Sequence, residues 1–115
     1  MKIVRIYTGP DGESHFEDID PQFTEKNNMR TKLQEAKGIL FRHTPAGYFK
    51  DFHTAPRRQY VLYLKGGIEI GVGDGSKRRM APGDVLLAND TTGRGHTSSA
   101  LDGEEGYSAF VTLED

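Results

Sequence analysis

The sequence predicts an all-β fold, an antiparallel sandwich or barrel, and three observations lead to this prediction. Segments rich in β-branched and aromatic residues recur about every 8–12 residues along most of the chain. Turns that contain glycine separate these segments, and glycine accounts for 14 of the 115 residues. The spacing of apolar residues that is typical of an amphipathic helix is almost absent.

The first third of the chain has one clear strand signal. Lys2–Thr8 alternates apolar and polar residues and is rich in β-branched side chains, and Gly-Pro-Asp-Gly at 9–12 predicts the turn that ends it. Residues 13–29 are polar, with an acidic cluster, and we expect mostly irregular chain there. Glu25–Ala36 has moderate helix propensity, but it offers a single apolar i, i+4 pair, which is weak support for a helix.

From residue 38 the β signal is continuous. Asp74-Gly75 is typical of the tight turn of a hairpin, and other turns contain proline or paired glycines. The predicted strands are Gly38–His43, Tyr48–Thr54, Gln59–Lys65, Ile68–Val72, Lys77–Met80, Val85–Asn89, Arg94–Ser99 and Tyr107–Leu113. Together with the N-terminal segment they give eight or nine strands.

Alternation along a strand predicts which side chains share a face. Gln59, Val61 and Tyr63 are expected to share one face of their strand, and Asp51 and His53 one face of theirs. In a closed barrel one of the two faces lines the interior, so a few polar residues are expected to line a cavity there.

Composition limits the function. A chain of 115 residues suits a single domain, 1–115. The net charge of -2 argues against a nucleic acid or an anionic membrane as the main partner. The absence of cysteine excludes disulfides, thiolate metal sites and cysteine nucleophiles. No apolar run has the length of a membrane span and the N-terminus lacks the core of a signal peptide, so we expect a cytoplasmic protein.

The segment 47–66 resembles the first motif of the cupin superfamily. That motif has a glycine, five residues, His-x-His, three or four residues, a glutamate, six residues and a second glycine. Here Gly47, His53, Gln59 and Gly66 keep this spacing, but Ala55 replaces the second histidine and Gln59 replaces the glutamate.

The segment 83–100 resembles the second cupin motif, which begins Pro-Gly-Asp and ends in a ligand histidine. Pro82-Gly83-Asp84 is present, and the histidine is His96, reached through a loop about two residues longer than usual. The resemblance covers residues 38–113. It implies a double-stranded β-helix, or jelly roll, of the small single-domain bacterial kind.

The resemblance also implies a divalent metal inside the barrel, held by His53, Gln59 and His96. Ala55 cannot ligate, so the set is neutral and lacks the carboxylate that usually compensates a divalent ion. Imidazole suits Fe, Mn, Ni, Zn or Cu, and the sequence does not select among them. A fourth ligand would restore affinity, and the candidates are Asp90, Tyr63 and His43.

Each of these residues has a plainer interpretation. His53 is equally consistent with a barrel-lining histidine bonded to Gln59, and His96 with the cap of a glycine-rich turn. Arg57 and the arginine after it are typical of a protected strand edge, with the alternative that one of them holds an anionic substrate at the barrel mouth. His43 suits the surface or the rim. The candidates for substrate binding are Tyr63, Arg57, Asp90 and His43.

Three functional hypotheses follow. The first is a metal-binding cupin with oxygenase or isomerase activity, and the second is a metal-free barrel that binds or senses a small molecule. The third is a structural barrel filled by aromatic side chains. Without metal, His53 or His96 could act as a general base, provided that Asp51 or Asp90 orients it. The resemblance further suggests a homodimer in which Lys2–Thr8 pairs with the sheet of a second subunit.

Overall fold

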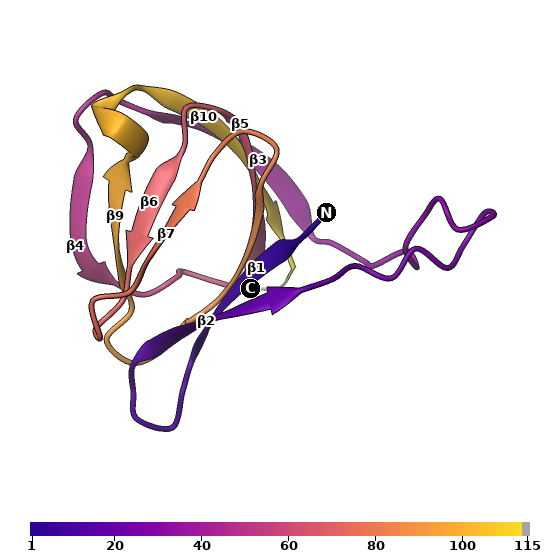
Figure 1. Ribbon diagram of the computed structural model, residues 1–115, viewed down its shortest axis with the longest axis horizontal. Coiled ribbons are helices and arrows are strands. Elements are labelled where there is room, and N and C mark those ends of the chain that lie inside the picture. The colour runs from indigo at the N-terminus through magenta and orange to yellow at the C-terminus, as the bar shows by residue number, and fades with distance from the viewer. Residues whose placement is uncertain (114–115) are drawn as a thin grey trace.

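The predicted segments become strands in the computed structural model, which describes residues 1–113. Two sheets face each other (Figure 1), a six-stranded sheet of order β2-β1-β8-β5-β10-β3 and a four-stranded sheet of order β4-β9-β6-β7. All pairings are antiparallel except that of β1 with β8. The strands are β1 Ile3–Thr8, β2 Ser14–Ile19, β3 Gly38–Thr44, β4 Phe49–His53, β5 Gln59–Lys65, β6 Ile68–Gly71, β7 Lys77–Met80, β8 Val85–Asn89, β9 His96–Ala100 and β10 Gly106–Thr112.

The all-β prediction is confirmed, and each predicted segment forms a strand. The bounds of β5, β7 and β8 agree with the prediction to the residue. Residues 114–115 of the expected domain lie outside the described part of the chain. Within that part, the one helical element is the short 3-10 turn Leu101–Gly103, and no helix is long and apolar enough to cross a membrane.

The expectation of irregular chain at 13–29 is wrong for its first part, which forms β2. This segment pairs antiparallel with β1, with Phe16 opposite Ile6 and Ser14 opposite Thr8. Its acidic residues are exposed and pair with arginines: Glu17 accepts a hydrogen bond of 3.0 Å from Arg5, and Asp18 accepts one of 2.8 Å from Arg78. The local signal for a strand is weak, and the partner strand supplies the backbone hydrogen bonds that stabilise it.

The weak helix signal at Glu25–Ala36 also fails, because this segment forms an exposed arm. Figure 1 shows the arm extending away from the sheets, and all residues from 22 to 41 are exposed. The arm turns at Lys26, Asn27 and Asn28, whose φ values of 51°, 59° and 63° are left-handed and incompatible with a right-handed helix. A bridge between Glu25 and Arg30 closes this turn.

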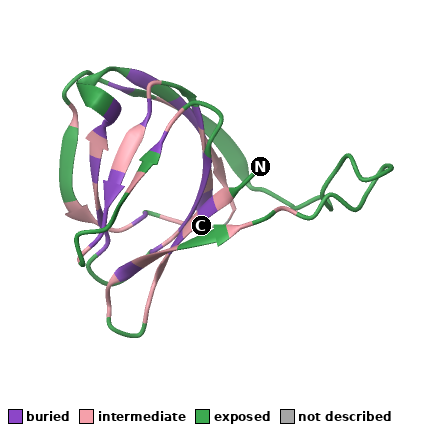
Figure 2. Ribbon diagram, viewed as in Figure 1, coloured by how far each residue is buried: buried purple, intermediate pink, exposed green. Residues whose placement is uncertain are grey.

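The hydrophobic core lies between the two sheets, where Figure 2 shows the buried residues. Val4, Ile6 and Leu86 supply the inner face of the larger sheet, and Ile70 and Met80 supply that of the smaller one. This core holds the two sheets at a spacing that leaves a cavity beside it.

The N-terminal strand pairs within its own sheet and not, as expected from the resemblance, with a second subunit. β1 lies between β2 and β8 of its own chain and is hydrogen-bonded on both sides. Both of its edges are therefore occupied, and it cannot also add to the sheet of a second subunit.

Candidate functional site

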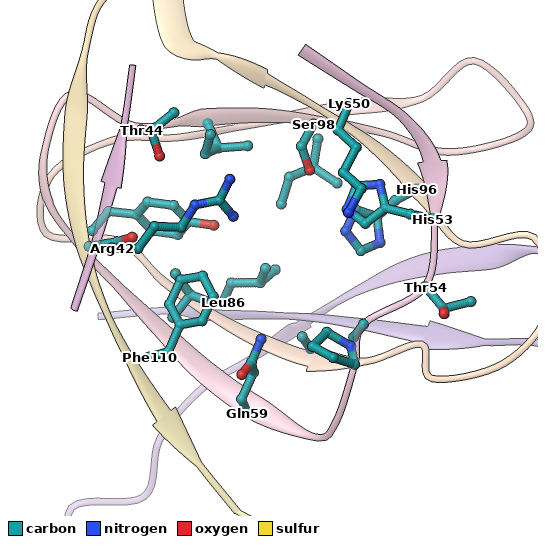
Figure 3. A pocket seen from close by; sticks show the side chains of 18 of the residues that line it. Arg42, Thr44, Lys50, His53, Thr54, Gln59, Leu86, His96, Ser98 and Phe110 are labelled. Atoms are coloured by element: carbon teal, nitrogen blue, oxygen red, sulfur yellow. The ribbon is translucent and has the colours of Figure 1, made fainter. Parts of the chain in front are cut away.

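A cavity of about 290 Å³ lies between the sheets, at the lower end of the size range of ligand pockets. Both sheets contribute polar side chains to its wall, and Figure 3 shows them converging on one space. Phe49 of β4 is 63% exposed and is not part of the wall, and the aromatic residues that line the cavity, Tyr48, Tyr63 and Phe110, leave its volume open. The interior is therefore not filled by aromatic side chains.

Two histidines stand side by side on the wall formed by the smaller sheet. His53 ends β4 and His96 begins β9, and the two are partners in the strand register. Their ring centroids lie 4.6 Å apart with an angle of 58° between the ring planes. The two cupin-like motifs thus meet at this pair, as the resemblance implied.

A β-bulge in β4 brings His53 to the cavity. The register between β4 and β9 shifts between Lys50 and His53, and both of these residues line the cavity. The predicted shared face of Asp51 and His53 assumed strict alternation and is wrong for this reason. Asp51 is exposed, so it does not orient a histidine through its carboxylate.

Asp90 contacts the His96 ring at Nδ1 and fixes its orientation. The His96 Nδ1 atom lies 2.5 Å from Asp90 Oδ2, which also accepts a 2.7 Å hydrogen bond from Ser14 Oγ on β2. Asp90 is fully buried, and its other oxygen, Oδ1, has no partner among the described residues. Asp90 therefore occupies the Nδ1 atom of His96, and Nε2 is the ring nitrogen without a protein partner in residues 1–113.

His53 is oriented in the same way, by a backbone carbonyl. Its Nδ1 donates to the carbonyl oxygen of Asp51 at 2.7 Å, and not to Gln59 as one interpretation of the sequence had it. Burial lowers the pKa of His53, the hydrogen bond to the Asp51 carbonyl acts in the opposite direction, and the charge of Lys50 lowers the pKa further. The His53 ring is therefore neutral at neutral pH, and its Nε2 atom is an unprotonated acceptor.

Gly95 allows the two motifs to approach closely. Its φ of 80° is left-handed, and a Cβ atom at this position would overlap the carbonyl group of His53. The neighbouring contact, in which the Ala55 amide donates to the Asp90 carbonyl at 3.0 Å, joins the same two segments. Glycine is needed here because the loop must pass directly against the end of β4.

The larger sheet supplies the opposite wall. Gln59, Val61 and Tyr63 of β5 line the cavity together, which confirms the face predicted for them. Burial raises the pKa of Tyr63, and the charge of Arg42 only partly offsets this effect. The Tyr63 phenol is therefore neutral and can donate a hydrogen bond.

Several buried polar groups on the wall lack a side-chain partner. Within residues 1–113, no hydrogen bond is found for the hydroxyl groups of Thr44, Tyr63, Ser98 and Ser108, and each of these residues is at least nine-tenths buried. Gln59 receives only a long contact of 3.4 Å from Arg57. In residues 1–113 the one fully buried polar side-chain atom without a partner is Asp90 Oδ1, so these hydroxyl groups open onto the cavity and are available to a polar occupant.

The charged groups on the wall are cations. Arg42 of β3 and Lys50 of β4 both line the cavity, and no aspartate or glutamate does. Neither cation forms an ion pair within the described part of the chain, although the Arg42 guanidinium lies 4.8 Å from the centre of the Tyr48 ring. The charged side chains that a ligand in the cavity would meet directly are therefore cationic.

The remaining candidates lie elsewhere. His43 is exposed, and its Nε2 atom lies 3.0 Å from Glu105 Oε2 outside the cavity. Consecutive residues of a strand point to opposite faces, and in β3 it is Arg42 that points into the cavity. Arg57 is not part of the wall and contacts it only through Gln59. Asp90 is not on the wall either and reaches it through His96.

Four residues at this site had no recognised signal in the sequence: Arg42, Lys50, Ser108 and Ser14. Alternation from Thr44 would have placed Arg42 on the same face, but which face is inward depends on the pairing with β10. Ser14 lies 76 positions before Asp90 in a polar segment, and only the fold joins them.

The donor set fits a divalent metal poorly. In residues 1–113, no group of three or more histidine, cysteine or acidic side chains could hold an ion. The two imidazoles lie on one sheet, Gln59 lies on the other, and the carboxylate of Asp90 is used behind His96. The cations on the wall add a further electrostatic cost.

Two solved structures resemble this chain. One is a cupin superfamily protein from Desulfitobacterium hafniense, with 20% sequence identity, a TM-score of 0.53 and coverage of 76% of this chain and 75% of that chain. The other, from Streptococcus pyogenes, is described as a conserved protein of unknown function, with 21% identity, a TM-score of 0.52 and coverage of 74% and 71%. No protein-family model matches the sequence, and no curated protein matches it. At this level of identity the likeness shows a common fold.

Proposed function

We propose that this chain, which has the cupin fold, binds a small polar molecule in its cavity and acts on it through His53 and His96. The observation that carries the proposal is the state of the paired rings. Both Nδ1 atoms are held by acceptors, so both Nε2 atoms are left to meet a ligand. The unpartnered hydroxyl groups on the wall support the same conclusion.

This arrangement suits proton transfer. A C–H or O–H proton of the ligand would pass to Nε2 of a neutral imidazole, and the electron pair of the broken bond would stay on the ligand. For His96 the resulting imidazolium is stabilised by Asp90. Returning the proton to another atom of the ligand completes an isomerisation without any other reactant.

Replacing either histidine should weaken ligand binding. Some small molecules are expected to bind in the cavity of the wild type. We expect His53→Ala and His96→Ala to weaken this binding by about tenfold or more, which is roughly 1.4 kcal/mol. NMR titration of the labelled protein with a panel of hydroxy acids, keto acids and sugars measures this. His43→Ala is the control, because His43 is exposed and lies outside the cavity. Equal affinity of all three variants would contradict the proposal.

Binding of a divalent ion by His53, Gln59 and His96 is the second candidate. It is favoured by the hydrogen bonds to both Nδ1 atoms, which are typical of metal-ligating histidines. Titration of the same variants with Zn, Mn, Fe, Ni and Cu salts distinguishes the two candidates. One tightly bound ion per chain, lost in both cavity variants and kept in His43→Ala, would establish the metal site.

We also propose a homodimer, formed through the outer face of the larger sheet. One row of cross-strand partners on this face is apolar on all six strands: Ile19, Ile3, Val85, Leu62, Ala109 and Phe41. The arm beside this face carries Leu33, which is 96% exposed, and Phe41 is 75% exposed. A second copy placed on this face would cover both, in a self-complementary contact.

The double variant Leu33→Glu, Phe41→Glu should be monomeric where the wild type is dimeric. Sedimentation velocity measures the mass, and circular dichroism checks the fold. Phe49→Glu is the control, because Phe49 is 63% exposed but lies on the smaller sheet. A wild type that sediments as a monomer, or a double variant that remains dimeric, would contradict this interface.

A further inference from the structure

Three side chains form a row across the larger sheet, on its inner face. Arg42 of β3 is the register partner of Ser108 on β10, and Ser108 is the register partner of Tyr63 on β5. Cross-strand partners have Cβ atoms about 5 Å apart, so the three side chains are neighbours. Thr44, two residues along β3 from Arg42, also lines the cavity.

The row offers hydrogen-bond donors that the protein leaves unused. Within residues 1–113, the Ser108 and Tyr63 hydroxyl groups have no hydrogen-bond partner and the Arg42 guanidinium has no carboxylate partner. Arg42 stacks near the ring of Tyr48, an arrangement that leaves the N–H groups at the edge of the guanidinium available. Figure 3 shows the Arg42 side chain reaching into the cavity.

Acidic groups near the row are already engaged. The negative charge of Asp84 acts on the pKa of Tyr63. However, Asp84 is exposed, and its carboxylate accepts a 2.8 Å hydrogen bond from the Ala81 amide. Asp90 is held behind His96. Lys50 on the opposite wall adds a second positive charge to the cavity.

We infer that this row, Arg42, Ser108 and Tyr63 with Thr44 beside it, binds the carboxylate or phosphate group of a small ligand. The inference rests on the proposed function and adds the class of ligand, a small oxyanion. An arginine fork with hydroxyl donors next to it matches the oxygens of such a group. The alternative expected for Arg57 or the arginine after it, an anion held at the barrel mouth, is replaced by Arg42, which lines the cavity while Arg57 does not.

The two walls divide the ligand between them. The row lies on the larger sheet, while His53 and His96 lie on the smaller one, across the cavity. A bound molecule would place its oxyanion at the row and its proton-donating group at the histidines. A small hydroxy acid has both groups, and the cavity of about 290 Å³ accommodates one.

The test compares glycolate with glycolamide, which has nearly the same shape but no charge, and includes inorganic phosphate as a third probe. NMR titration of the labelled full-length protein follows the Ser108 amide and the His53 and His96 rings. We expect glycolate or phosphate to bind at least tenfold more tightly than glycolamide. Arg42→Gln should remove most of this preference, and Arg57→Gln, the control, should keep it.

Tyr63→Phe is the second variant, because it keeps the buried ring and removes only the hydroxyl group. We expect it to weaken glycolate or phosphate binding several-fold, with an unchanged circular dichroism spectrum. Equal binding of glycolate, phosphate and glycolamide in the cavity would overturn the oxyanion site and leave the proposed function standing. Loss of the preference in Arg57→Gln rather than in Arg42→Gln would also overturn it. If none of the three probes perturbs His53 or His96, both the inference and the proposed function fail.

Discussion

Gly95→Ala is expected to destabilise the protein by about 3 kcal/mol or more. Two costs combine at this position. A residue with a side chain is strained at the left-handed φ of 80°, and its Cβ atom would overlap the backbone carbonyl of His53. Because backbone cannot move aside as the tip of a side chain can, the end of β4 and the loop before β9 must separate. That movement would also part His53 from His96.

Urea unfolding monitored by circular dichroism measures the free energy of unfolding. Gly75→Ala is the matched control, since Gly75 has a φ of 90° but no atom lies within 4 Å of the position of an added Cβ. It carries the conformational cost alone, about 1–2 kcal/mol. Equal losses in the two variants would show that the close approach at Gly95 does not exist.

Asp90→Ala is expected to cost about 2–4 kcal/mol of stability and to release His96 from its fixed tautomer. The change leaves the His96 Nδ1–H and the Ser14 hydroxyl buried without their shared acceptor. Desolvated donors of this kind cost more than the net gain of a hydrogen bond, which explains the size of the effect. Ligand binding at the cavity should weaken as well, because His96 would no longer be held facing it.

Two measurements separate the structural effect from the positioning effect. Urea unfolding gives the stability, and the nitrogen chemical shifts of the His96 ring give the proportion of each tautomer. Ser14→Ala is the control, because it removes one donor but leaves the bond between Asp90 and His96, and we expect it to cost about 1 kcal/mol with no change of tautomer. If Asp90→Ala leaves the His96 tautomer unchanged, Asp90 has no positioning role.

The strands were largely predictable because their signals are local. In Gln59–Lys65, every second side chain points into the interior, and the sequence predicts this same period of two. Turn residues with restricted backbone, such as those at Asp74-Gly75, end the strands wherever they occur. The prediction failed for β2, whose own residues are polar and whose strand depends on its pairing with β1.

The meeting of His53 and His96 was predictable from the two motifs. The side of β4 to which His53 points was not predictable. A bulge changes the side to which a residue points, and nothing local in β4 marks where it occurs. The helix signal in the arm failed for a related reason. Met29 and Leu33, its apolar i, i+4 pair, are 72% and 96% exposed, so they gain little from packing, which provides most of the stability of a short helix.

The amino-acid order alone predicted a β-sheet protein, because alternation and turn chemistry act over short stretches of chain, and the resemblance of two motifs predicted the cupin fold and the meeting of His53 and His96. The fold was needed to reveal that Ser14 and Asp90 hold His96 in place, that Arg42 rather than Arg57 faces the cavity, and that β1 is already paired on both edges. These features depend on which strands become neighbours. The pairing of strands depends on the total apolar surface buried in both sheets, which cannot be calculated from any single segment of the sequence.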